Sequence, residues 1–212
     1  DFDAIRSKNC ESIKTYSRNL ASKVISEMEL TIPEKPAGQN LADMLIKLKD
    51  STLITQIINA QRCEREIAFV YKMNNRITLT GQMDLLYQDT DGRWHVVDYK
   101  SDNVVAQQVA GHARKYELQM MLYLVAARRH FGENVSDATI YFLKPGMTYK
   151  FSATVENLAS TTQRLEDLTN HLFGCRATGR FERIYHSNPA HCRYCPYASL
   201  CLPKVKNAQS PR

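Results

Sequence analysis

Two acidic residues and one lysine lie in two apolar segments that flank a turn. The segments QMDLLYQ (82–88) and RWHVVDYK (93–100) contain Asp84, Asp98 and Lys100. The dipeptide Asp91-Gly92 between them is typical of a hairpin turn. A carboxylate in an apolar strand costs free energy unless a partner balances it. The pattern therefore raises the question of what these two acids bind.

Strand geometry predicts that the three charged groups converge. In a hairpin centred on Asp91, Asp84 lies opposite Asp98, with Cβ atoms about 4.5–5.5 Å apart. Side chains alternate along a strand, so Asp98 and Lys100 share a face. A cation relieves the repulsion between two carboxylates, and oxygen ligands suit Mg²⁺ or Mn²⁺. Such a metal activates water for phosphodiester hydrolysis, and a lysine orients that water or offsets charge.

Two other interpretations of the hairpin stay open. A strand register shifted by one residue would weaken the convergence of the acids. The same residues also fit a structural Asp–Lys pair on a solvated face of the sheet.

The segments around this hairpin alternate between helical and extended patterns. Apolar spacing predicts helices over 3–29, 40–62 (with a break at Ser51-Thr52), 111–132 and 157–174, and prolines predict a linker over 31–38. β-Rich segments predict strands over 64–72, 76–88, 93–100, 138–144 and 148–155. This order predicts an α/β fold, a mixed central sheet flanked by helices. We expect three regions: an N-terminal helix and linker (1–38), a core (39–185) and a cysteine-rich tail (186–212).

Composition fits a globular protein with a modest positive charge. The net charge is +6 and the isoelectric point about 9.0, which suits a polyanionic partner such as nucleic acid but also an ordinary basic protein. Candidate phosphate contacts are Arg114, Lys115, Arg128 and Arg129, the last two equally suited to a solvated helix end. No apolar run reaches the roughly 18 residues of a membrane span. The start lacks a signal-peptide pattern and an initiator Met, so we expect a cytoplasmic protein and a fragment of a longer chain.

Four short motifs resemble the nuclease domain of the bacterial RecB and AddA helicase–nucleases, in the PD-(D/E)XK superfamily. In chain order they are Arg65-Glu66-x-x-Phe69, Gly81-x-x-Asp84, Asp98-Tyr99-Lys100 and Gln119-x-x-x-Tyr123. Each motif alone is weak, but four in the family's order are fairly specific. The resemblance spans about residues 40–145. It implies a restriction-endonuclease-like fold and a metal-dependent exodeoxyribonuclease, with residues 39–185 as the nuclease core.

The resemblance assigns roles to individual residues. Asp84 and Asp98 correspond to ligands of Mg²⁺ or Mn²⁺, joined by the backbone carbonyl of Tyr99, and Lys100 corresponds to the catalytic lysine. Glu66 is a further candidate at the metal site, although a salt bridge with Arg65 or Lys72 is an alternative. The remaining motif implies DNA contacts or site positioning by Gln119 and Tyr123, with ordinary helix packing as the alternative.

The resemblance also implies partners. The substrate would be DNA, as single strands or strand ends, acted on during double-strand-break repair and recombination. A helicase motor would lie outside this chain, on the same full-length protein or a partner subunit, because no Gly-x-x-x-x-Gly-Lys-Ser/Thr loop occurs here. Two alternatives stay open: a catalytically weak or inactive DNA-binding module of the same fold, and a stand-alone CRISPR-associated or phage exonuclease.

One feature departs from the family's pattern. The family usually has a metal-binding histidine well before its first acid, whereas the first histidine of this chain is His95. Strand alternation places His95 on the opposite face from Asp98, so it is not nominated as a ligand.

Three cysteines near the C-terminus form the second candidate site. Cys192, Cys195 and Cys201 are spaced C-x2-C-x5-C, which lets the first two thiolates reach one metal from a single turn. The spacing is similar to the iron–sulfur nucleases, AddB and CRISPR-associated relatives, in which an upstream cysteine completes a structural [4Fe–4S] cluster. Cys10 fits that order, and Cys63 and Cys175 are alternatives. Zinc is the rival metal, with His186 or His191 as possible ligands.

Overall fold

The computed structural model describes residues 2–181 and 195–196. Their contacts divide the chain into two units, Asp1–Leu165 and Glu166–Arg212. The helices are α1 (Phe2–Ser7), α2 (Cys10–Glu27), α3 (Glu34–Lys49), α4 (Thr52–Ile58), α5 (Val109–Ala113), α6 (Glu117–Phe131) and α7 (Val155–Thr178). The strands are β1 (Arg62–Lys72), β2 (Thr78–Gln88), β3 (Trp94–Lys100), β4 (Val135–Phe142) and β5 (Met147–Ser152).

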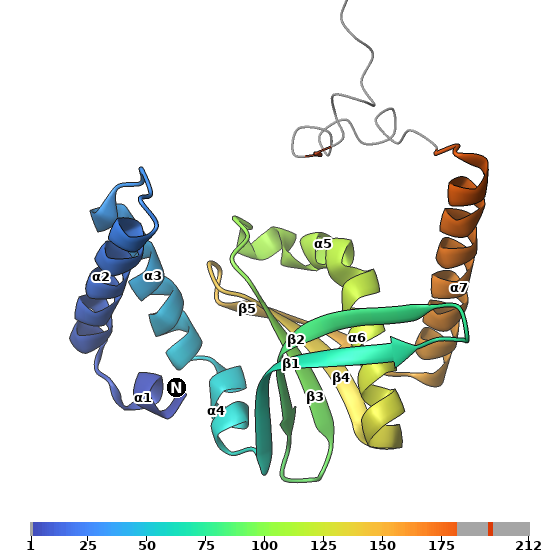
Figure 1. Cartoon of the computed structure of the whole chain (residues 1–212). Helices are drawn as coiled ribbons and strands as arrows, with labels where there is room; N and C mark the ends of the chain where they lie inside the picture. Colours follow the sequence, from blue (N-terminus) through green and yellow to red (C-terminus); the bar gives the residue numbers. More distant parts are fainter. Residues whose placement is uncertain (1, 182–194, 197–212) are drawn as a thin grey trace, which may run out of the picture. The chain divides into compact units, whose positions relative to one another are not determined.

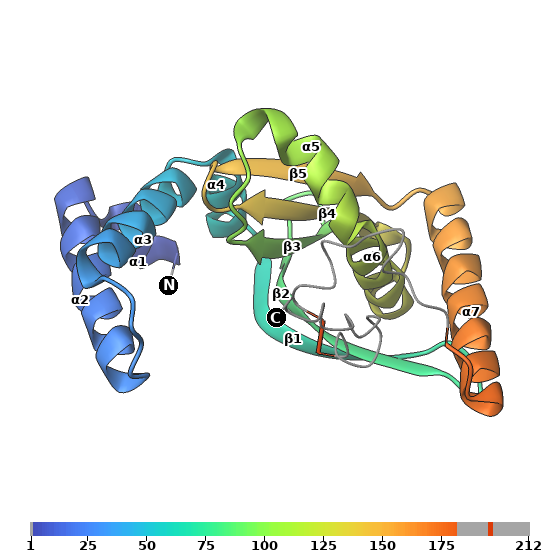
Figure 2. The same ribbon diagram turned by 90° about the horizontal axis from the view of Figure 1, so that it is seen from above.

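The strands form one mixed sheet in the order β1-β2-β3-β4-β5. Neighbouring strands are antiparallel except β3 and β4, which are parallel and joined by the crossover through α5 and α6. The arrows of β3 and β4 point the same way in Figure 2, and that of β5 is reversed. The structure therefore confirms the predicted α/β fold with a mixed central sheet flanked by helices.

Each face of the sheet carries its own hydrophobic cluster, because strand side chains alternate. Trp94 and Val96 of β3 share one face with apolar residues of α6. Val97 of β3 shares the other with Leu53 and Ile54 of α4. Figure 1 shows α4 and α6 on opposite sides of the sheet. Asp98 lies two residues after Val96 on the same strand, so its side chain points to the same face of the sheet, toward α6.

The hairpin between β2 and β3 forms as its sequence predicts. The Asp89 carboxylate accepts hydrogen bonds from the backbone N–H groups of Asp91 (2.9 Å) and Arg93 (2.8 Å). Gly92 takes a positive φ of 81°, which glycine adopts without steric cost. Leu85 pairs with Val97, so the register is the one predicted from a loop centred on Asp91. This register brings the two acids to the same level of the sheet.

The first antiparallel pair, β1 and β2, contains a close approach of side chain and backbone. A Cβ atom on Gly81 would lie 2.7 Å from the ring of Phe69, nearer than real Cβ contacts allow. The same Phe69 ring meets Tyr123 of α6 edge-on, with ring centroids 5.8 Å apart. Glycine at the start of the Gly81-x-x-Asp84 motif therefore provides the space in which Phe69 supports α6.

Several segments differ from the sequence expectation. The helix predicted over 3–29 is divided into α1 and α2, and the helical pattern predicted over 40–62 ends at Ile58, before β1. The structure has helix α3 from Glu34 onward, where a linker over 31–38 was predicted. Pro36 lies in the first turn of α3, where a missing N–H costs little. Gly38 lets α3 approach α2 closely, since a Cβ there would lie 3.1 Å from Arg18 Cα. The pattern over 111–132 forms α5, a 3₁₀ turn at 114–116 and α6 rather than one helix.

Candidate active site

Asp84 and Asp98 meet beyond the end of the β2–β3 ladder. They are the next residues along each strand after the Leu85–Val97 pair. The Asp84 carboxylate accepts a hydrogen bond of 2.8 Å from the backbone N–H of Tyr99. In a strand, the N–H and C=O of one residue point toward the same neighbouring strand. The Tyr99 carbonyl therefore also points toward the β2 side, where Asp84 lies.

Asp98 and Lys100 form a buried ion pair. The Asp98 residue is 1% exposed, and the Lys100 ammonium lies 2.6 Å from its Oδ2 atom. Burial raises the pKa of Asp98, as do the nearby Asp84 and Asp102 carboxylates, against the lowering effect of Lys100. The Lys100 ammonium is thus the cation that balances the buried Asp98 carboxylate in this structure. A metal ion at the acids would share Asp98 with Lys100, because a carboxylate has two oxygens that accept.

Glu66 lies at the level of Asp84 on β1, in a strained conformation. Arg65 pairs with Leu85 and Ile67 with Met83, so the residues between these pairs are Glu66 and Asp84. Glu66 has a φ of 52°, in the left-handed region that non-glycine residues rarely adopt. Its exposed carboxylate accepts a hydrogen bond of 2.7 Å from Gln82 Nε2. The hydrogen-bond partner of Glu66 in this structure is thus Gln82, rather than the Arg65 or Lys72 considered from the sequence.

Gln119 and Tyr123 lie one turn apart on α6 and contact each other. Gln119 Nε2 donates to the Tyr123 hydroxyl over 2.9 Å. Tyr123 is 6% exposed and belongs to the core between α6 and the sheet. Burial raises the pKa of Tyr123, and the charges of Asp98 and Asp84 add to this against the Gln119 hydrogen bond. The charges of both acids thus act on Tyr123. Its burial in the core indicates that it helps to position the site.

Sequence reasoning missed three residues beside Lys100. The Lys100 ammonium lies 4.7 Å from the ring centroid of Tyr116. The Tyr116 hydroxyl donates to Asp102, with oxygens 2.9 and 3.0 Å away. His112 Nε2 is also 3.0 Å from Asp102 Oδ1. Burial raises the pKa of Asp102, but hydrogen bonds from His112 and Tyr116 outweigh it and lower the pKa below its ordinary value. Residue spacing does not reveal this group, because Asp102 follows the end of β3 and a 3₁₀ turn begins between His112 and Tyr116.

The donor set at the acids suits a hard cation. Asp84, Asp98 and the Tyr99 carbonyl supply oxygen atoms, which Mg²⁺ and Mn²⁺ prefer. No group of three or more His, Cys, Asp or Glu side chains with metal-binding geometry occurs among the described residues. Two carboxylates with a backbone carbonyl would leave most coordination positions to water and substrate, as Mg²⁺ sites usually do.

Most of the predicted cysteine site lies outside the described residues. Cys192 and Cys201, with His186 and His191, fall there, so the structure does not describe a cluster. Among the described cysteines, Cys195 is half-buried, Cys10 and Cys63 are exposed, and Cys175 is buried, all with free thiols. Cys10 is the first residue of α2.

A second polar cluster lies on the opposite face of the sheet, around His95. His95 Nδ1 is 3.0 Å from Asp137 Oδ2, and its Nε2 is 3.0 Å from Asp89 Oδ2. Lys150 adds a contact of 3.3 Å to Asp137, and the Tyr87 ring stacks on the imidazole at 4.8 Å. The cluster connects β3 to β4 and to the β2–β3 turn, away from Asp98, as the alternation of β3 requires.

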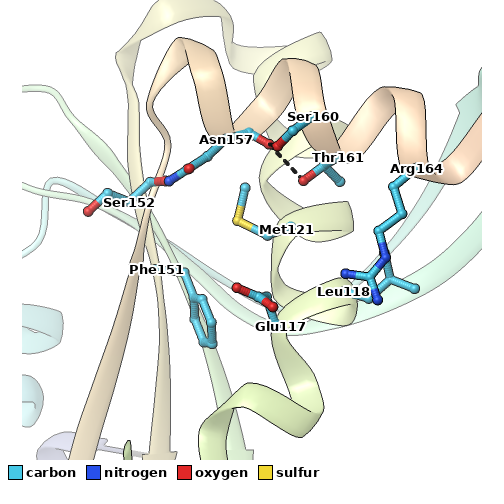
Figure 3. Close-up of a pocket in the computed structure, with 9 residues that line it drawn as sticks. All are labelled: Glu117, Leu118, Met121, Phe151, Ser152, Asn157, Ser160, Thr161 and Arg164. Carbon is cyan, nitrogen blue, oxygen red and sulfur yellow. Dashed lines mark hydrogen bonds between the residues drawn. The ribbon is translucent and has the colours of Figure 1, made fainter.

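A cavity of about 230 Å³ lies between α6, β5 and the first turns of α7. Figure 3 shows Glu117 and Met121 of α6 around it, with Phe151 of β5 and Arg164 of α7. Glu117 and Met121 occupy the flank of α6 opposite Gln119 and Tyr123, because two residues along a helix turn through about 200°. The cavity is thus separated by α6 from the flank that carries Gln119 and Tyr123.

Comparison with known proteins agrees with the fold. The model of the PD-(D/E)XK nuclease superfamily matches residues 10–202. Among solved structures, a candidate exonuclease from Eubacterium rectale is 12% identical, with a TM-score of 0.52 over 97% of this chain and 78% of that chain. The protein SSO0001 is 15% identical, with a TM-score of 0.45 over 85% of this chain and 79% of that chain. No curated protein matches the sequence.

The family match spans nearly the whole chain, including both strands that carry the acids. It coincides with a five-stranded mixed sheet whose β2 and β3 bring two carboxylates and a lysine together. From this agreement of sequence and fold, the chain belongs to the PD-(D/E)XK nuclease superfamily.

Proposed function

We propose that this chain is a metal-dependent deoxyribonuclease domain that hydrolyses phosphodiester bonds at Asp84, Asp98 and Lys100. The observation that carries the proposal is the Asp98–Lys100 ion pair of 2.6 Å, buried beside Asp84. A buried acid and amine on one strand face, with a second acid on the next strand, cost stability, and such groups are frequent at functional sites.

In this proposal Asp84, Asp98 and the Tyr99 carbonyl hold Mg²⁺ or Mn²⁺. The ion, when bound, lowers the pKa of its water and neutralises charge on the phosphate. Lys100 orients the attacking water or offsets charge that develops on the phosphate oxygens. Asp98 orients the Lys100 ammonium, and the Tyr99 N–H fixes one oxygen of Asp84. Glu66 is a further candidate ligand, with one of its two carboxylate oxygens bound to Gln82 in this structure.

The resemblance to the RecB and AddA nuclease domains supports a narrower assignment. We propose exonucleolytic action on single-stranded DNA, with Gln119 and Tyr123 positioning the strand near the acids. The domain would work beside a helicase motor in the bacterial cytoplasm, in double-strand-break repair and recombination. A stand-alone exonuclease of the CRISPR-associated or phage type has the same site and is the second candidate.

The test of catalysis uses end-labelled single-stranded DNA with Mg²⁺, Mn²⁺ or EDTA. The wild type should cleave with metal only, and Lys100→Ala should lower the rate by at least about 10². Lys150→Ala is the matched control, because Lys150 also pairs with a buried aspartate, Asp137, on the other face of the sheet. It should cleave like the wild type.

The outcome separates the remaining alternatives. DNA binding without cleavage in either metal would contradict the enzyme and leave the inactive binding module. An equal loss of cleavage rate in Lys100→Ala and Lys150→Ala would mean that both changes act on folding in general. A circular single strand should resist a true exonuclease, so its rapid cleavage would exclude exonucleolytic action.

We also propose that Cys192, Cys195 and Cys201 bind a [4Fe–4S] cluster with Cys10 as the fourth ligand. The C-x2-C-x5-C spacing and the exposed thiol of Cys10 support this. Protein purified without oxygen should contain iron and sulfide in equal amounts. Cys10→Ser should lose the iron, whereas Cys63→Ser and Cys175→Ser should retain it. Iron loss in either of the latter instead would reassign the fourth ligand, and zinc without sulfide would replace the cluster.

A further inference from the structure

Lys100 needs a second support besides Asp98. A lysine side chain has four rotatable bonds and loses about 2 kcal/mol of rotamer freedom when fixed. One ion pair defines the position of the ammonium on one side only. The Tyr116 ring lies on another side, 4.7 Å from the ammonium to the ring centroid. The side chain of Lys100 is 18% exposed between these two groups.

An aromatic ring suits this position. Its face attracts the ammonium through the ring quadrupole, without supplying a full negative charge. A third carboxylate at this distance would add to the repulsion between Asp84 and Asp98. The ring therefore restrains the amine without itself adding a charge next to the acids.

The Tyr116 ring is itself held in place. Its hydroxyl reaches both oxygens of Asp102, at 2.9 and 3.0 Å, and His112 contacts the same carboxylate at 3.0 Å. His112 and Tyr116 pack against the Phe142 ring, with centroids 5.8 and 6.5 Å away. Asp102 follows Lys100 by two residues, so the loop that leaves β3 and the turn that leads into α6 are joined next to the amine.

We propose that Tyr116 is a positioning residue for Lys100, held in place by Asp102 and His112. This inference rests on the proposed function, because it gives Lys100 a catalytic task. It also explains why the crossover contains a 3₁₀ turn at residues 114–116. The turn ends at Tyr116, the residue that precedes α6, and brings its ring to the end of β3.

The test compares Tyr116→Leu, Tyr116→Phe and a matched control. Tyr116→Leu removes the ring and should lower kcat on single-stranded DNA by about 10², with little change in KM, because a misplaced group costs rate rather than binding. Tyr116→Phe keeps the ring but loses its hydroxyl bond to Asp102, so it should restore part of kcat. The control, Tyr71→Leu, changes a half-buried tyrosine packed against the same core from β1 and should keep wild-type kcat.

A second measurement does not depend on activity. Mild acetylation followed by mass spectrometry gives the labelling rate of each lysine. Loss of a cation–π contact should raise the rate at Lys100 in Tyr116→Leu by about 2- to 5-fold, without changing the rate at Lys150. Tyr116→Phe should raise the rate at Lys100 less than Tyr116→Leu does, and Tyr71→Leu should leave both rates unchanged.

The two measurements together support or overturn the role of Tyr116. Slow cleavage by Tyr116→Leu, partly restored by Tyr116→Phe, together with faster labelling of Lys100 in Tyr116→Leu, supports the inference. Unchanged kcat in Tyr116→Leu overturns it, as does equal loss of kcat in Tyr71→Leu. If the wild type fails to cleave DNA, the proposed function fails on its own. The positioning contact then stands if Lys100 labels faster in Tyr116→Leu and falls if it does not.

Discussion

Glu66 concentrates the strain of the candidate site in one residue. Its φ of 52° places a non-glycine residue in the left-handed region, on the strand beside Asp84. That conformation costs roughly 1–2 kcal/mol for a residue with a Cβ atom. Strain of this kind persists where surrounding structure enforces it, and it is frequent next to functional groups.

Glycine at position 66 should therefore be tolerated where glycine is normally harmful. Glycine in a strand costs about 0.5–1 kcal/mol in backbone entropy, and relief of the left-handed strain offsets this for Glu66→Gly. The matched change Glu64→Gly, also exposed on β1, has no strain to relieve and should lose about 1 kcal/mol. Denaturant unfolding gives the change in the free energy of unfolding for each variant. Equal losses of this free energy in the two variants would mean that Glu66 is unstrained in solution.

The core of the site could be predicted from the sequence, whereas its surroundings could not. Asp84, Asp98 and Lys100 follow from a hairpin register that one Asp-Gly turn determines. Tyr116 and His112 depend on where the crossover bends, and apolar periodicity over 111–132 predicts one continuous helix without that bend. The strain at Glu66 has no signal in residue type. Local periodicity thus predicts what one hairpin determines, but not where separate segments meet.

The elements β3 and β4 are joined by the His95 cluster as well as by backbone hydrogen bonds. Although burial alone lowers the pKa of His95, hydrogen bonds to Asp137 and Asp89 and their charges raise it above its ordinary value. Lys150 and Arg93 also contact these aspartates, and the Tyr87 ring covers the imidazole. The protonated form of His95 is thus the one that the fold stabilises.

This raised pKa predicts a pH dependence of stability. The stabilisation is fully present below the unfolded pKa of about 6.5 and is lost as pH rises through the higher folded pKa. The free energy of unfolding should therefore fall as pH rises above about 6.5 and through the higher folded pKa. His95→Gln should remove most of this slope. Urea unfolding at several pH values measures this slope. A wild-type unfolding free energy that stays constant as pH rises would contradict the claim that the fold stabilises protonated His95.

Helices α2 and α3 depend on a glycine at their contact. Glycine to alanine inside a helix normally stabilises by about 1 kcal/mol. Gly38→Ala should not, because the added Cβ would lie 3.1 Å from the Arg18 backbone and push the helices apart. Gly174→Ala on α7 is the control, since nothing lies within 4 Å of its Cβ position, and should stabilise the protein. Equal gains in melting temperature would mean that α2 and α3 do not pack this closely.

At the scale of the whole molecule, a net charge of +6 favours binding to a polyanion. No helix among the described residues is long and apolar enough to span a membrane. Charge of this kind acts through release of counterions from nucleic acid, so affinity should fall as salt rises. Binding in EDTA isolates this effect from catalysis.

Two exposed basic residues before α6 are the best-placed contributors. Replacing Arg114 and Lys115 by glutamine should weaken binding to single-stranded DNA and lower the slope of log affinity against log salt by about 1.4, or 0.7 for each lost phosphate contact. Lys23→Gln on α2, where Lys23 pairs with Glu27, should leave the slope unchanged. Fluorescence anisotropy over a salt series measures both. An unchanged slope in the double variant would remove this turn from the DNA path.

The close approach at Gly81 restricts what relatives of this chain can look like. The ring of Phe69 occupies the space that any side chain at position 81 would need, and it supports Tyr123 from that place. A larger residue at 81 would require a smaller one at 69, and Tyr123 would then lose its neighbour. We therefore expect these three positions to covary among homologues, as a physical constraint that links the first acidic motif to the helix that completes the site.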